Sequence, residues 1–499
     1  MKATKHMNIM NLSKSDFLKY RICPSYFWLW KNNPELVPED SPAEVRENKF
    51  EQGNMIETIA RQLFPNGVLV EGYSTQAVSN TERLVADGAE VIFQATVMTE
   101  NNLLAMADVI ERDGYGWILY EVKSSSSVKR DRHIPDMAFQ KLAFETAGYT
   151  INSTKVIHLN KEFVRNGDTI NPQTFFVTED VSDAVAKILP EVCDQVTLAL
   201  EKMLQTDTPT SCNCRLLSRG KHCPTFTQFN PDVPNYSVYD IARMQGKKLA
   251  ELVDGEIFDI KEIPDDFSLT PNQQFQVDIE RSGVPYINLE AIRQELSKLE
   301  FPLYFLDYES VNPAIPLIDG IKPHQQMVFQ YSLHILDTPD GELRHTEHLS
   351  RGSSFDALRA LASQMREDIG DTGSVIVWHK MFERDRNKDL GLLLPQYGEL
   401  YESINQRLYD LKDVFSKNYY VHPEFHGSNS IKDVLPVLAP DLSYKELAIG
   451  KGDIAAVRWY EIVTKENNEE AEQVFADLLV YCKLDTLAMV RIYKYLKSL

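Results

Sequence analysis

The sequence predicts an α/β protein in which two domains, the second with a mixed central sheet, are joined by a helical connector. Three observations predict this class. The chain has 499 residues, more than one ordinary hydrophobic core accommodates. Strand patterns between two helical patterns occupy residues 88–126, and a second set of strand patterns begins near residue 300. The stretch between the two sets contains short helical patterns and breaks with Pro and Asp, so we expect domains at 1–228 and 300–499 and a connector at 229–299.

The composition is that of a globular protein, with 43% hydrophobic and 25% charged residues. A net charge of −21 argues against broad attraction to nucleic acid, although carboxylates that hold divalent cations add to such a total. We find no signal peptide and no run of about 18 apolar residues, so we expect a cytoplasmic protein with no membrane partner. Six cysteines in so long a chain indicate metal binding or packing and not a disulfide framework.

The first domain is predicted to contain strands at 91–98, 103–112 and 116–125, with a turn at Asp113-Gly114 between the last two. Asp108 then lies on one strand, and Glu121 and Lys123 lie on its neighbour, on one face because they are two residues apart. Two carboxylates and a lysine suit phosphodiester hydrolysis assisted by Mg²⁺ or Mn²⁺. A surface charge pair at a strand end is the alternative.

Two predicted helices flank these strands. One covers 48–65 and contains Glu57. The other covers 133–150, with Pro135 near its first turn, Gly148 as its end and Gln140 inside. This order, with "YEVKSSSSVK" followed by "DMAFQ", resembles the core of the PD-(D/E)XK nucleases, in the RecB-like branch that includes CRISPR-adaptation nucleases.

The resemblance implies a set of site residues. It assigns catalytic roles to Asp108, Glu121, Lys123 and Gln140, and metal ligation to Glu57, Asp108 and Glu121. Glu57 is the nearest candidate to the first-helix His that often binds metal in this branch. The branch acts mostly on DNA, so DNA is the expected substrate.

Four cysteines flank this domain: Cys23 before it, and Cys212, Cys214 and Cys223 after it. The arrangement resembles that of RecB-like nucleases, in which four thiolates hold a [4Fe-4S] cluster. The CxC spacing with an eight-residue gap also allows zinc, with His222 as a spare ligand. A third alternative is reduced thiols packed without metal. The remaining two, Cys193 and Cys482, are expected to be ordinary core residues.

The second domain is predicted to begin with a strand, "PLYFLDYESV", that carries Asp307 and Glu309 on one face. Strands at 327–336 and 343–350 follow, and then a helix opened by Ser353 or Ser354 and ended by Gly370. The strand "VIVWH" leads into a helix that is expected to start near Glu383.

A late helix in "DLLVYCKLDTLAMVRIYKYL" carries Tyr481 and Asp485 one turn apart on one face. Alone, this pair is typical of a Tyr at the core edge and a solvated or capping Asp. With the upstream acids, the order resembles that of the DnaQ-like 3′–5′ exonucleases of the RNase H-like fold. In that resemblance Tyr481 orients or helps to deprotonate the attacking water.

The same resemblance implies that two divalent ions about 4 Å apart bind to the acids of this domain. The implied ligands are Asp307, Glu309, Glu383 and Asp485, with Asp385 as an alternative to Glu383. Asp410 and the segment "HGSNSIKDVLPVL" also match the DnaQ-like pattern, but less specifically.

Four segments, "LYFLDYES", "GIKPHQQMVFQYSLHIL", "HGSNSIKDVLP" and "YCKLDTLAM", also resemble a bacterial family that is formally a domain of unknown function. Its members join a RecB-like half to a DnaQ-like half. We therefore expect a nuclease with two metal-dependent active sites, acting on nucleic acid, on DNA more than RNA, in repair or in defence against mobile DNA. Three alternatives stay open: an RNA-processing exonuclease, a nucleic-acid-binding scaffold with one inactive site, and a redox-sensing regulatory subunit.

Overall fold

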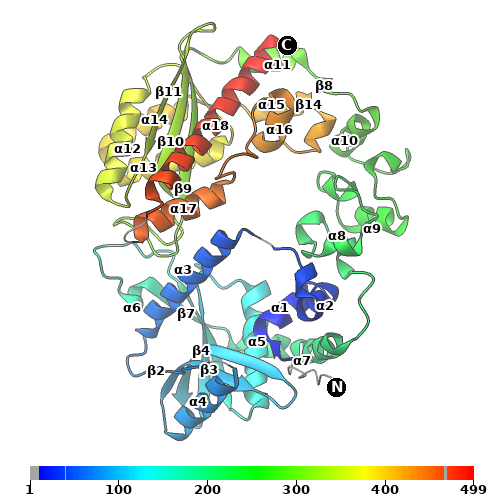
Figure 1. Cartoon of the computed structure of the whole chain (residues 1–499), viewed down its shortest axis with the longest axis vertical. Coiled ribbons are helices and arrows are strands. Elements are labelled where there is room, and N and C mark those ends of the chain that lie inside the picture. Colours follow the sequence, from blue (N-terminus) through cyan, green and yellow to red (C-terminus); the bar gives the residue numbers. More distant parts are fainter. Residues whose placement is uncertain (1–9, 40, 73, 466–468) are drawn as a thin grey trace, which may run out of the picture. The chain divides into compact units, whose positions relative to one another are not determined.

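The computed structural model describes residues 10–39, 41–72, 74–465 and 469–499. The chain divides into two compact units (Figure 1). Unit 1 comprises the chain up to Ser41 together with Lys49–Pro231, and unit 2 comprises Pro42–Asn48 together with Asp232–Leu499. Both contain sheets and helices, so the predicted α/β class is confirmed. Among the described residues, no helix combines the length and apolar character needed to cross a bilayer.

Unit 1 is built on a sheet in which six strands follow the order β2-β3-β4-β5-β6-β7 and β1 pairs with β4. Strands β3, β4 and β5 are antiparallel neighbours, and β6 runs parallel to β5. The bounds are β1 Leu12–Ser13, β2 Val68–Leu69, β3 Val91–Met98, β4 Leu103–Asp113, β5 Gly116–Lys123, β6 Ile151–Leu159 and β7 Phe176–Asp180.

Helix α5 packs on β4 and β6 of this sheet, and α7 packs against α5. The core between them is apolar, and Phe17 stacks on Phe139 with ring centroids 5.2 Å apart. The helices are α1 Lys14–Ile22, α2 Pro24–Asn32, α3 Ala43–Arg61, α4 Ser74–Ala86, α5 Arg130–Thr146, α6 Pro172–Phe175, α7 Ser182–Leu204 and α8 Phe226–Phe229.

The predicted strand 91–98 coincides with β3, and β4 and β5 differ from prediction by one or two residues at their ends. Helix α5 begins earlier than predicted, at Arg130, so Pro135 lies in its second turn. A proline there has no N–H to donate to the carbonyl four residues earlier. The helix tolerates this loss because it is anchored by buried residues along the following turns.

Unit 2 is built on a sheet of order β11-β10-β9-β12-β13. Strands β11, β10 and β9 are antiparallel neighbours, whereas β12 and β13 run parallel to β9. A separate pair joins β8 to β14. The bounds are β8 Tyr286–Ile287, β9 Leu303–Val311, β10 Met327–Leu336, β11 Leu343–Leu349, β12 Ser374–Val377, β13 Leu408–Asp410 and β14 Tyr420–Val421.

Helices cover both faces of this sheet (Figure 1). Alternate residues of β10 decide the faces: Tyr331 and Leu333 pack with α12, while Gln330 and Ser332 bond to α18. Helix α17 packs against β9. The helices are α9 Gly246–Asp254, α10 Pro271–Ser282, α11 Leu289–Leu296, α12 Phe355–Asp368, α13 Lys380–Leu393, α14 Gly398–Gln406, α15 Asp413–Ser416, α16 Ile431–Leu438, α17 Gly452–Thr464 and α18 Ala471–Ser498.

Helix capping sets two boundaries in unit 2. Ser354 caps α12 by accepting a hydrogen bond from the Ala357 N–H at 3.1 Å, as the sequence predicts. Helix α13 begins at Lys380, three residues before the predicted start at Glu383. The reason is His379, whose Nδ1 accepts a hydrogen bond from the Phe382 N–H at 3.2 Å and so caps the helix earlier.

Candidate functional site

The first candidate site lies in unit 1, where β4 supplies Asp108, β5 supplies Glu121 and Lys123, and α5 supplies Gln140. Lys123 Nζ lies 2.6 Å from Glu121 Oε1, and Gln140 Nε2 donates to Glu121 Oε2 at 2.6 Å. Asp108 Oδ2 accepts a hydrogen bond from the Val122 N–H at 2.7 Å. The structure therefore brings these four predicted residues together.

Two further residues of this site escape sequence reasoning. Lys14, the first residue of α1, places its Nζ 2.6 Å from Glu121 Oε1 and 3.5 Å from Asp136 Oδ1. Asp136 on α5 also contacts Lys123 Nζ, at 2.7 Å. Asp136 stands within the quoted motif "DMAFQ", but no local pattern marks Lys14, which is 107 residues from its partner Glu121. We call these six residues the amino-terminal acid site: Lys14, Asp108, Glu121, Lys123, Asp136 and Gln140.

The pKa values of the two predicted carboxylates in this site, Asp108 and Glu121, are shifted in opposite directions. Burial raises the pKa of Asp108 to about 8, and the negative charge of Glu121 adds to this effect. Burial also opposes ionisation of Glu121, but the ammonium groups of Lys123 and Lys14 overcome it and lower the pKa of Glu121 to about 2. Glu121 is thus an ion-paired carboxylate beside a carboxyl group that favours its proton.

Glu57 stands apart from this lysine-bound group. Its carboxylate accepts hydrogen bonds from Arg61 Nη2 at 2.6 Å and from Gln94. Its charge reaches the site, because it contributes to the raised pKa of Asp108. Among the described residues, Glu57, Asp108 and Glu121 do not converge as closely spaced ligand atoms, so the predicted three-carboxylate arrangement is not assembled here.

The second candidate site is the cysteine cluster, defined as Cys23, Cys212, Cys214 and Cys223. Their Sγ atoms all lie within 4.8 Å of one another, and all four residues are buried. Cys23 lies between α1 and α2, whereas the other three follow α7. The two segments are tied together beside the cluster, since Ser25 Oγ donates to the Ser211 carbonyl at 2.6 Å. The prediction that these four cysteines gather is confirmed.

The thiols of the cluster influence one another. Hydrogen bonds from Cys214 and Cys223 lower the pKa of Cys212 to about 7, and hydrogen bonds from the other three thiols lower the pKa of Cys23. The predicted spare ligand, His222, instead stacks on Phe226 and has its Nε2 2.9 Å from the Leu217 carbonyl oxygen.

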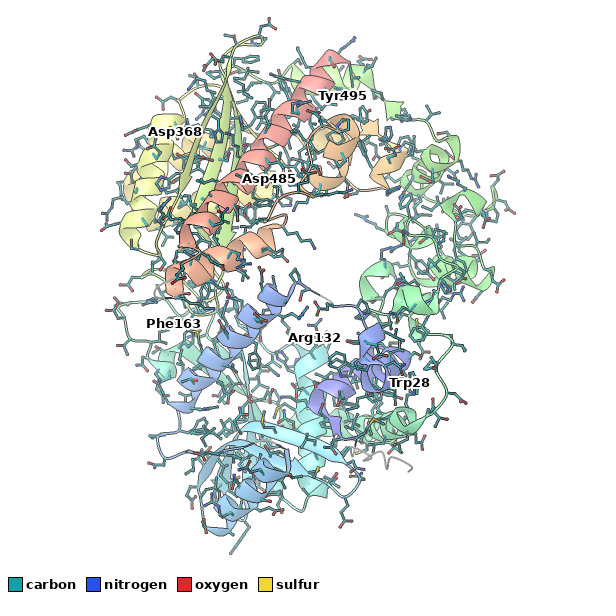
Figure 2. The ribbon with its side chains drawn as sticks, viewed as in Figure 1. Trp28, Arg132, Phe163, Asp368, Asp485 and Tyr495 are labelled. Carbon is teal, nitrogen blue, oxygen red and sulfur yellow. The ribbon has the colours of Figure 1, made fainter. Side chains whose placement is uncertain are left out.

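The third candidate site lies in unit 2, where β9 supplies Asp307 and Glu309, and α18 supplies Tyr481 and Asp485. Figure 2 labels Asp485 on α18. The register of α18 on the sheet is held by Thr486, whose Oγ1 lies 2.8 Å from Ser332 Oγ on β10. We call these five residues the carboxyl-terminal acid site: Asp307, Glu309, Glu383, Tyr481 and Asp485.

Cys482 borders this site. It is fully buried, as predicted for a core residue, but its Sγ donates to Asp307 Oδ2 at 3.8 Å. One ligand atom each from Asp307, Glu309 and Cys482 lie within 4.8 Å of one another. The second cysteine predicted to be a core residue, Cys193, is only half-buried on α7.

Hydrogen bonds orient the two predicted groups of α18. Tyr444 OH donates to Asp485 Oδ1 at 2.6 Å, and Lys432 Nζ donates to Tyr481 OH at 3.3 Å. Lys432 also donates to the Gly450 carbonyl at 3.0 Å. Sequence reasoning assigned no role to Tyr444 or Lys432, although Lys432 belongs to the quoted segment "HGSNSIKDVLPVL".

Glu383 lies on α13, and its charge acts on Asp307. Neither Glu383 nor Asp485 belongs to the group of ligand atoms that lie within 4.8 Å of one another, which consists of Asp307, Glu309 and Cys482 among the described residues. Glu383 is 2% exposed, and its Oε2 atom is buried without a hydrogen-bond partner in the described part of the chain. Burial raises the pKa of Glu383 to about 8. The alternative, Asp385, has a half-exposed side chain that pairs with Arg384 Nη2 at 3.1 Å. Asp410, a softer match, caps local turns by accepting from the Lys380 and Lys412 N–H groups.

The carboxylates of this site repel one another. Burial raises the pKa of Asp307 well above its ordinary value, with added repulsion from Asp485, Glu309 and Glu383. Burial and the charge of Asp485 also raise the pKa of Glu309, and burial raises that of Asp485 to about 6. Over the described ranges, none of the four acids forms a salt bridge with Lys or Arg. One ammonium group acts on the site from a greater distance, because the charge of Lys432 opposes the rise in the pKa of Glu309 and of Asp485. The site therefore concentrates four carboxyl groups around a single nearby cation that makes no salt bridge with them in the described part of the chain.

The first turn of α17 closes this site. A Cβ atom placed on Gly452, the first residue of α17, would lie 3.7 Å from Glu309 Oε2 and 3.8 Å from Tyr481 OH. The helix N-terminus is favourable for nearby negative charge because its first N–H groups are not bonded within the helix.

Comparisons with known proteins give one family model and several relatives. Residues 304–430 match the sequence model of a family described as Domain of unknown function (DUF2779). The uncharacterized protein UU173 of Ureaplasma parvum serovar 3 is 28% identical over 302 residues, which cover 53% of this chain and 41% of the relative. The uncharacterized protein MG366 of Mycoplasma genitalium is 28% identical over 221 residues, which cover 41% of this chain and 33% of the relative.

The MG366 homolog of Mycoplasma pneumoniae is 25% identical over 220 residues, covering 40% of this chain and 33% of the relative. The chain thus spans less than half the length of each of these three relatives. The matched family segment begins within β9, just before Asp307 and Glu309, and ends at Ser430, which caps α16. The centre of unit 2, including three of its four predicted metal ligands, Asp307, Glu309 and Glu383, is therefore similar to the DUF2779 family.

Proposed function

We propose that the chain is a metal-dependent nuclease that hydrolyses phosphodiester bonds, with one active site in each unit. The observation that carries this proposal is the carboxyl-terminal acid site. Four carboxyl groups, Asp307, Glu309, Glu383 and Asp485, are largely buried there, and among the described residues none of them forms a salt bridge with Lys or Arg. The one ammonium group whose charge reaches Glu309 and Asp485 is that of Lys432, so negative groups outnumber it. Buried charges of one sign are costly unless a metal or an opposite charge compensates them.

The residues present fit a divalent cation. The buried Oε2 of Glu383 has no partner within the described chain, and carboxylate oxygens are the ligands that Mg²⁺ and Mn²⁺ prefer. The four carboxylates would hold the ions, which when bound polarise the phosphate and make water a stronger nucleophile. The raised pKa values of these acids measure how strongly the site favours an added positive charge, whether a proton or a metal.

The protein's own groups would position the water. Tyr481 OH is held in place by Lys432 Nζ at 3.3 Å, next to Asp485 on the same helix face. Tyr444 OH holds the Asp485 carboxylate at 2.6 Å. A phenol fixed in this way can orient an attacking water by hydrogen bonding, while burial keeps its pKa raised and its proton in place.

The sheet of unit 2 supports a DnaQ-like, RNase H-like assignment. Three antiparallel strands are followed by two parallel strands, helices cover both faces, and the acids stand on the central strand β9 and on the last helix. This is the mixed central sheet expected of such a domain. It supplies the rigid support that a metal site requires.

In unit 1 we propose a PD-(D/E)XK-type site at Asp108, Glu121, Lys123 and Gln140. An antiparallel β3-β4-β5 group followed by α5 and the parallel strand β6 supports this assignment. Asp108 and Glu121 would hold the cation, with Gln140 fixing Glu121. Because Lys14 Nζ already contacts Glu121 Oε1, a cation bound there must share or displace that contact.

We propose a metal centre in the cysteine cluster. The four Sγ atoms all lie within 4.8 Å of one another, which is compatible with one tetrahedral ion, because metal–sulfur bonds of about 2.3 Å at the tetrahedral angle separate the thiolates by about 3.8 Å. A [4Fe-4S] cluster, which the resemblance implies, binds each thiolate at a different corner and requires them to stand farther apart. Absorbance near 400 nm in anaerobic preparations would establish iron–sulfur, whereas a colourless protein containing zinc would establish the single ion.

The substrate we propose is DNA, because the RecB-like resemblance of unit 1 is to a branch that acts mostly on DNA, in repair or in defence against mobile DNA. The test incubates the purified full chain with Mn²⁺ and end-labelled single- and double-stranded DNA and RNA. Glu121→Ala and Asp307→Ala should each remove a distinct part of the cleavage pattern.

A matched pair of variants sharpens this test. Glu383→Gln and Asp385→Asn change neighbouring acids on the same helix, one buried in the site and one half-exposed. Only Glu383→Gln should reduce cleavage. The proposal fails if Glu121→Ala and Asp307→Ala both cut as the parent does.

A further inference from the structure

A cavity of about 220 Å³ lies within unit 2, separate from the carboxyl-terminal acid site. Helix α10 forms one wall, and β14 with the turn at 422–429 forms the other. None of the four site acids lines it. Its volume is below that of most pockets for drug-sized ligands and suits a group of a single ring system.

The lining is aromatic and amide-rich. Phe275, Tyr236 and Phe425 supply rings, and Asn272, Gln276 and Asn418 supply amides. No Lys or Arg lines the cavity, and its one carboxylate, Glu280, has Lys261 Nζ at 3.4 Å. His422 is a further lining residue. A site for phosphate is typically built from Arg or Lys, which make charge-assisted hydrogen bonds to it, and the described lining supplies neither, so it favours a neutral group. Aromatic faces with amide donors and acceptors are the groups that recognise an unpaired nucleobase.

Two of the lining groups are held in place. Gln276 Nε2 donates to Tyr236 OH at 2.7 Å, and Gln276 Oε1 accepts from the Ala242 N–H at 3.0 Å. The ring of Phe275 stands nearly perpendicular to that of Tyr286, with centroids 5.1 Å apart. Groups fixed before binding lose little conformational freedom when a ligand arrives.

The cavity is connected to the acid site through a short stretch of chain. Asn429, which lines the cavity, is three residues before Lys432, whose Nζ contacts Tyr481 OH. Three residues span at most about 11 Å. The stretch is anchored, because the Asn429 carbonyl accepts from Trp378 Nε1 at 3.2 Å and Ser430 caps α16. The cavity and the segment that holds Tyr481 are therefore joined by three residues of anchored chain.

We infer that this cavity binds one unpaired nucleobase of the strand that is bound at the carboxyl-terminal acid site. We call it the base pocket. The inference rests on the proposed nuclease function and narrows its substrate to single-stranded nucleic acid or an unpaired end. A paired base has its hydrogen-bonding edge occupied and its faces covered by stacking, so it cannot enter.

The test measures binding of the full chain to single-stranded oligonucleotides in buffer without added divalent cation. Each oligonucleotide carries one abasic position, which is moved along the strand. The parent should lose affinity about tenfold at one position or two adjacent positions, because the missing base no longer stacks in the pocket.

Phe275→Leu keeps an apolar side chain without the aromatic face, and Asn272→Ala removes an exposed amide. Both should bind the intact oligonucleotide several-fold more weakly and lose the response to the sensitive abasic position. Gln274→Ala is the matched control, because Gln274 lies on the same helix but does not line the pocket. If Phe275→Leu has a lowered melting temperature, its weaker binding could reflect misfolding, and the result for Asn272→Ala alone then decides whether the base pocket is correct.

The inference is overturned if no abasic position weakens binding, if the pocket variants respond to it as the parent does, or if the chain binds no oligonucleotide. Its failure is distinct from that of the proposed function. If the chain cleaves with Mn²⁺ in a manner that depends on Asp307 but shows no sensitive abasic position, the base pocket is contradicted and the nuclease function is not. If the chain shows a sensitive abasic position that depends on Phe275 but does not cleave, the base pocket is supported and the nuclease function is contradicted.

Discussion

In unit 1, Lys14 and Lys123 each contact Glu121 Oε1 at 2.6 Å, whereas in unit 2 the acids Asp307 and Glu309 have a thiol and other carboxyl groups as neighbours. The consequence is opposite for the two sites. The lysines lower the pKa of Glu121 to about 2 despite its burial. In unit 2 burial and mutual repulsion raise the pKa of Asp307 and Glu309 instead.

The difference shows two ways to keep acidic groups inside a protein. Unit 1 balances its ionised carboxylate with its own ammonium groups, so the arrangement is stable without a ligand. Unit 2 leaves the balance to protons or to an added cation.

The largest effect is expected at Asp485. Asp485→Ala removes a proposed metal ligand, so carboxyl-terminal cleavage should fall roughly 10³-fold, equivalent to several kcal/mol of lost charge stabilisation, and Mn²⁺ affinity should fall as well. Tyr481→Phe should reduce cleavage roughly 10²-fold and leave Mn²⁺ affinity unchanged, because the phenol acts on water and not on the metal. Cleavage rates and Mn²⁺ calorimetry measure both quantities. Equal loss of Mn²⁺ affinity in the two variants would contradict these roles.

Stability should change in opposite directions in the two sites. Glu121→Ala leaves two ammonium groups beside Asp136 alone, and breaking a buried ion pair costs about 3–5 kcal/mol. Asp307→Asn removes a group whose charge is opposed by burial and by its neighbours, and should raise the free energy of unfolding of the metal-free chain. Urea unfolding at pH 8 measures both. If Asp307→Asn lowers the free energy of unfolding while the control Asp385→Asn leaves it unchanged, the proposed difference between the two acid sites is contradicted.

The dependence of stability on pH should also differ. The pKa of Glu383 is raised from 4.5 to about 8, so the folded chain binds more protons than the unfolded chain between these values. Its contribution to stability is therefore present at low pH and is lost as pH rises from about 4.5 to about 8, by at most about 1.4 kcal/mol per pH unit.

The contribution of Glu121 to stability changes with pH in the opposite direction. Its pKa is lowered from 4.5 to about 2, so its contribution is present above pH 4.5 and is lost as pH falls toward 2. Unfolding free energies at pH 3 to 8 measure both trends. Glu383→Gln should flatten only the loss at high pH, and Mn²⁺ should reduce that same loss. A parent-like slope in Glu383→Gln would contradict the assignment.

The smallest effect is expected at Lys14. Its side chain is 26% exposed, and Lys123 remains beside Glu121 when it is removed. Lys14→Ala should therefore lower the free energy of unfolding by about 1 kcal/mol or less. Lys14→Arg keeps the charge and should restore most of it. A loss as large as that of Glu121→Ala would show that Lys14 alone balances the site.

Local sequence determined most of the elements that carry the candidate sites. The period of two in a strand placed Glu121 with Lys123 and Asp307 with Glu309, and the helical period placed Tyr481 with Asp485. Three cysteines lie within twelve residues at 212–223, which predicted a site there, and the resemblance to RecB-like nucleases added Cys23. The structure confirms that the four meet.

The neighbours across the sites were decided by the tertiary structure. Lys14 meets Glu121 from 107 residues away, and Tyr444 and Lys432 reach Asp485 and Tyr481 from separate segments. The hydrogen bond from Gln94 to Glu57, 37 residues apart, likewise depends on packing of separate segments. The early start of α13, by contrast, follows from the local cap at His379.

The physical reason is the range of the interactions. Backbone periodicity is local, so the sequence by itself determines which face of a strand or helix a residue occupies. Which charges then oppose one another, and hence whether a buried carboxylate is paired with lysine or left for a metal, depends on how distant segments pack. Only the tertiary structure therefore decides how the buried carboxylates are neutralised, and the difference between the two acid sites follows from it.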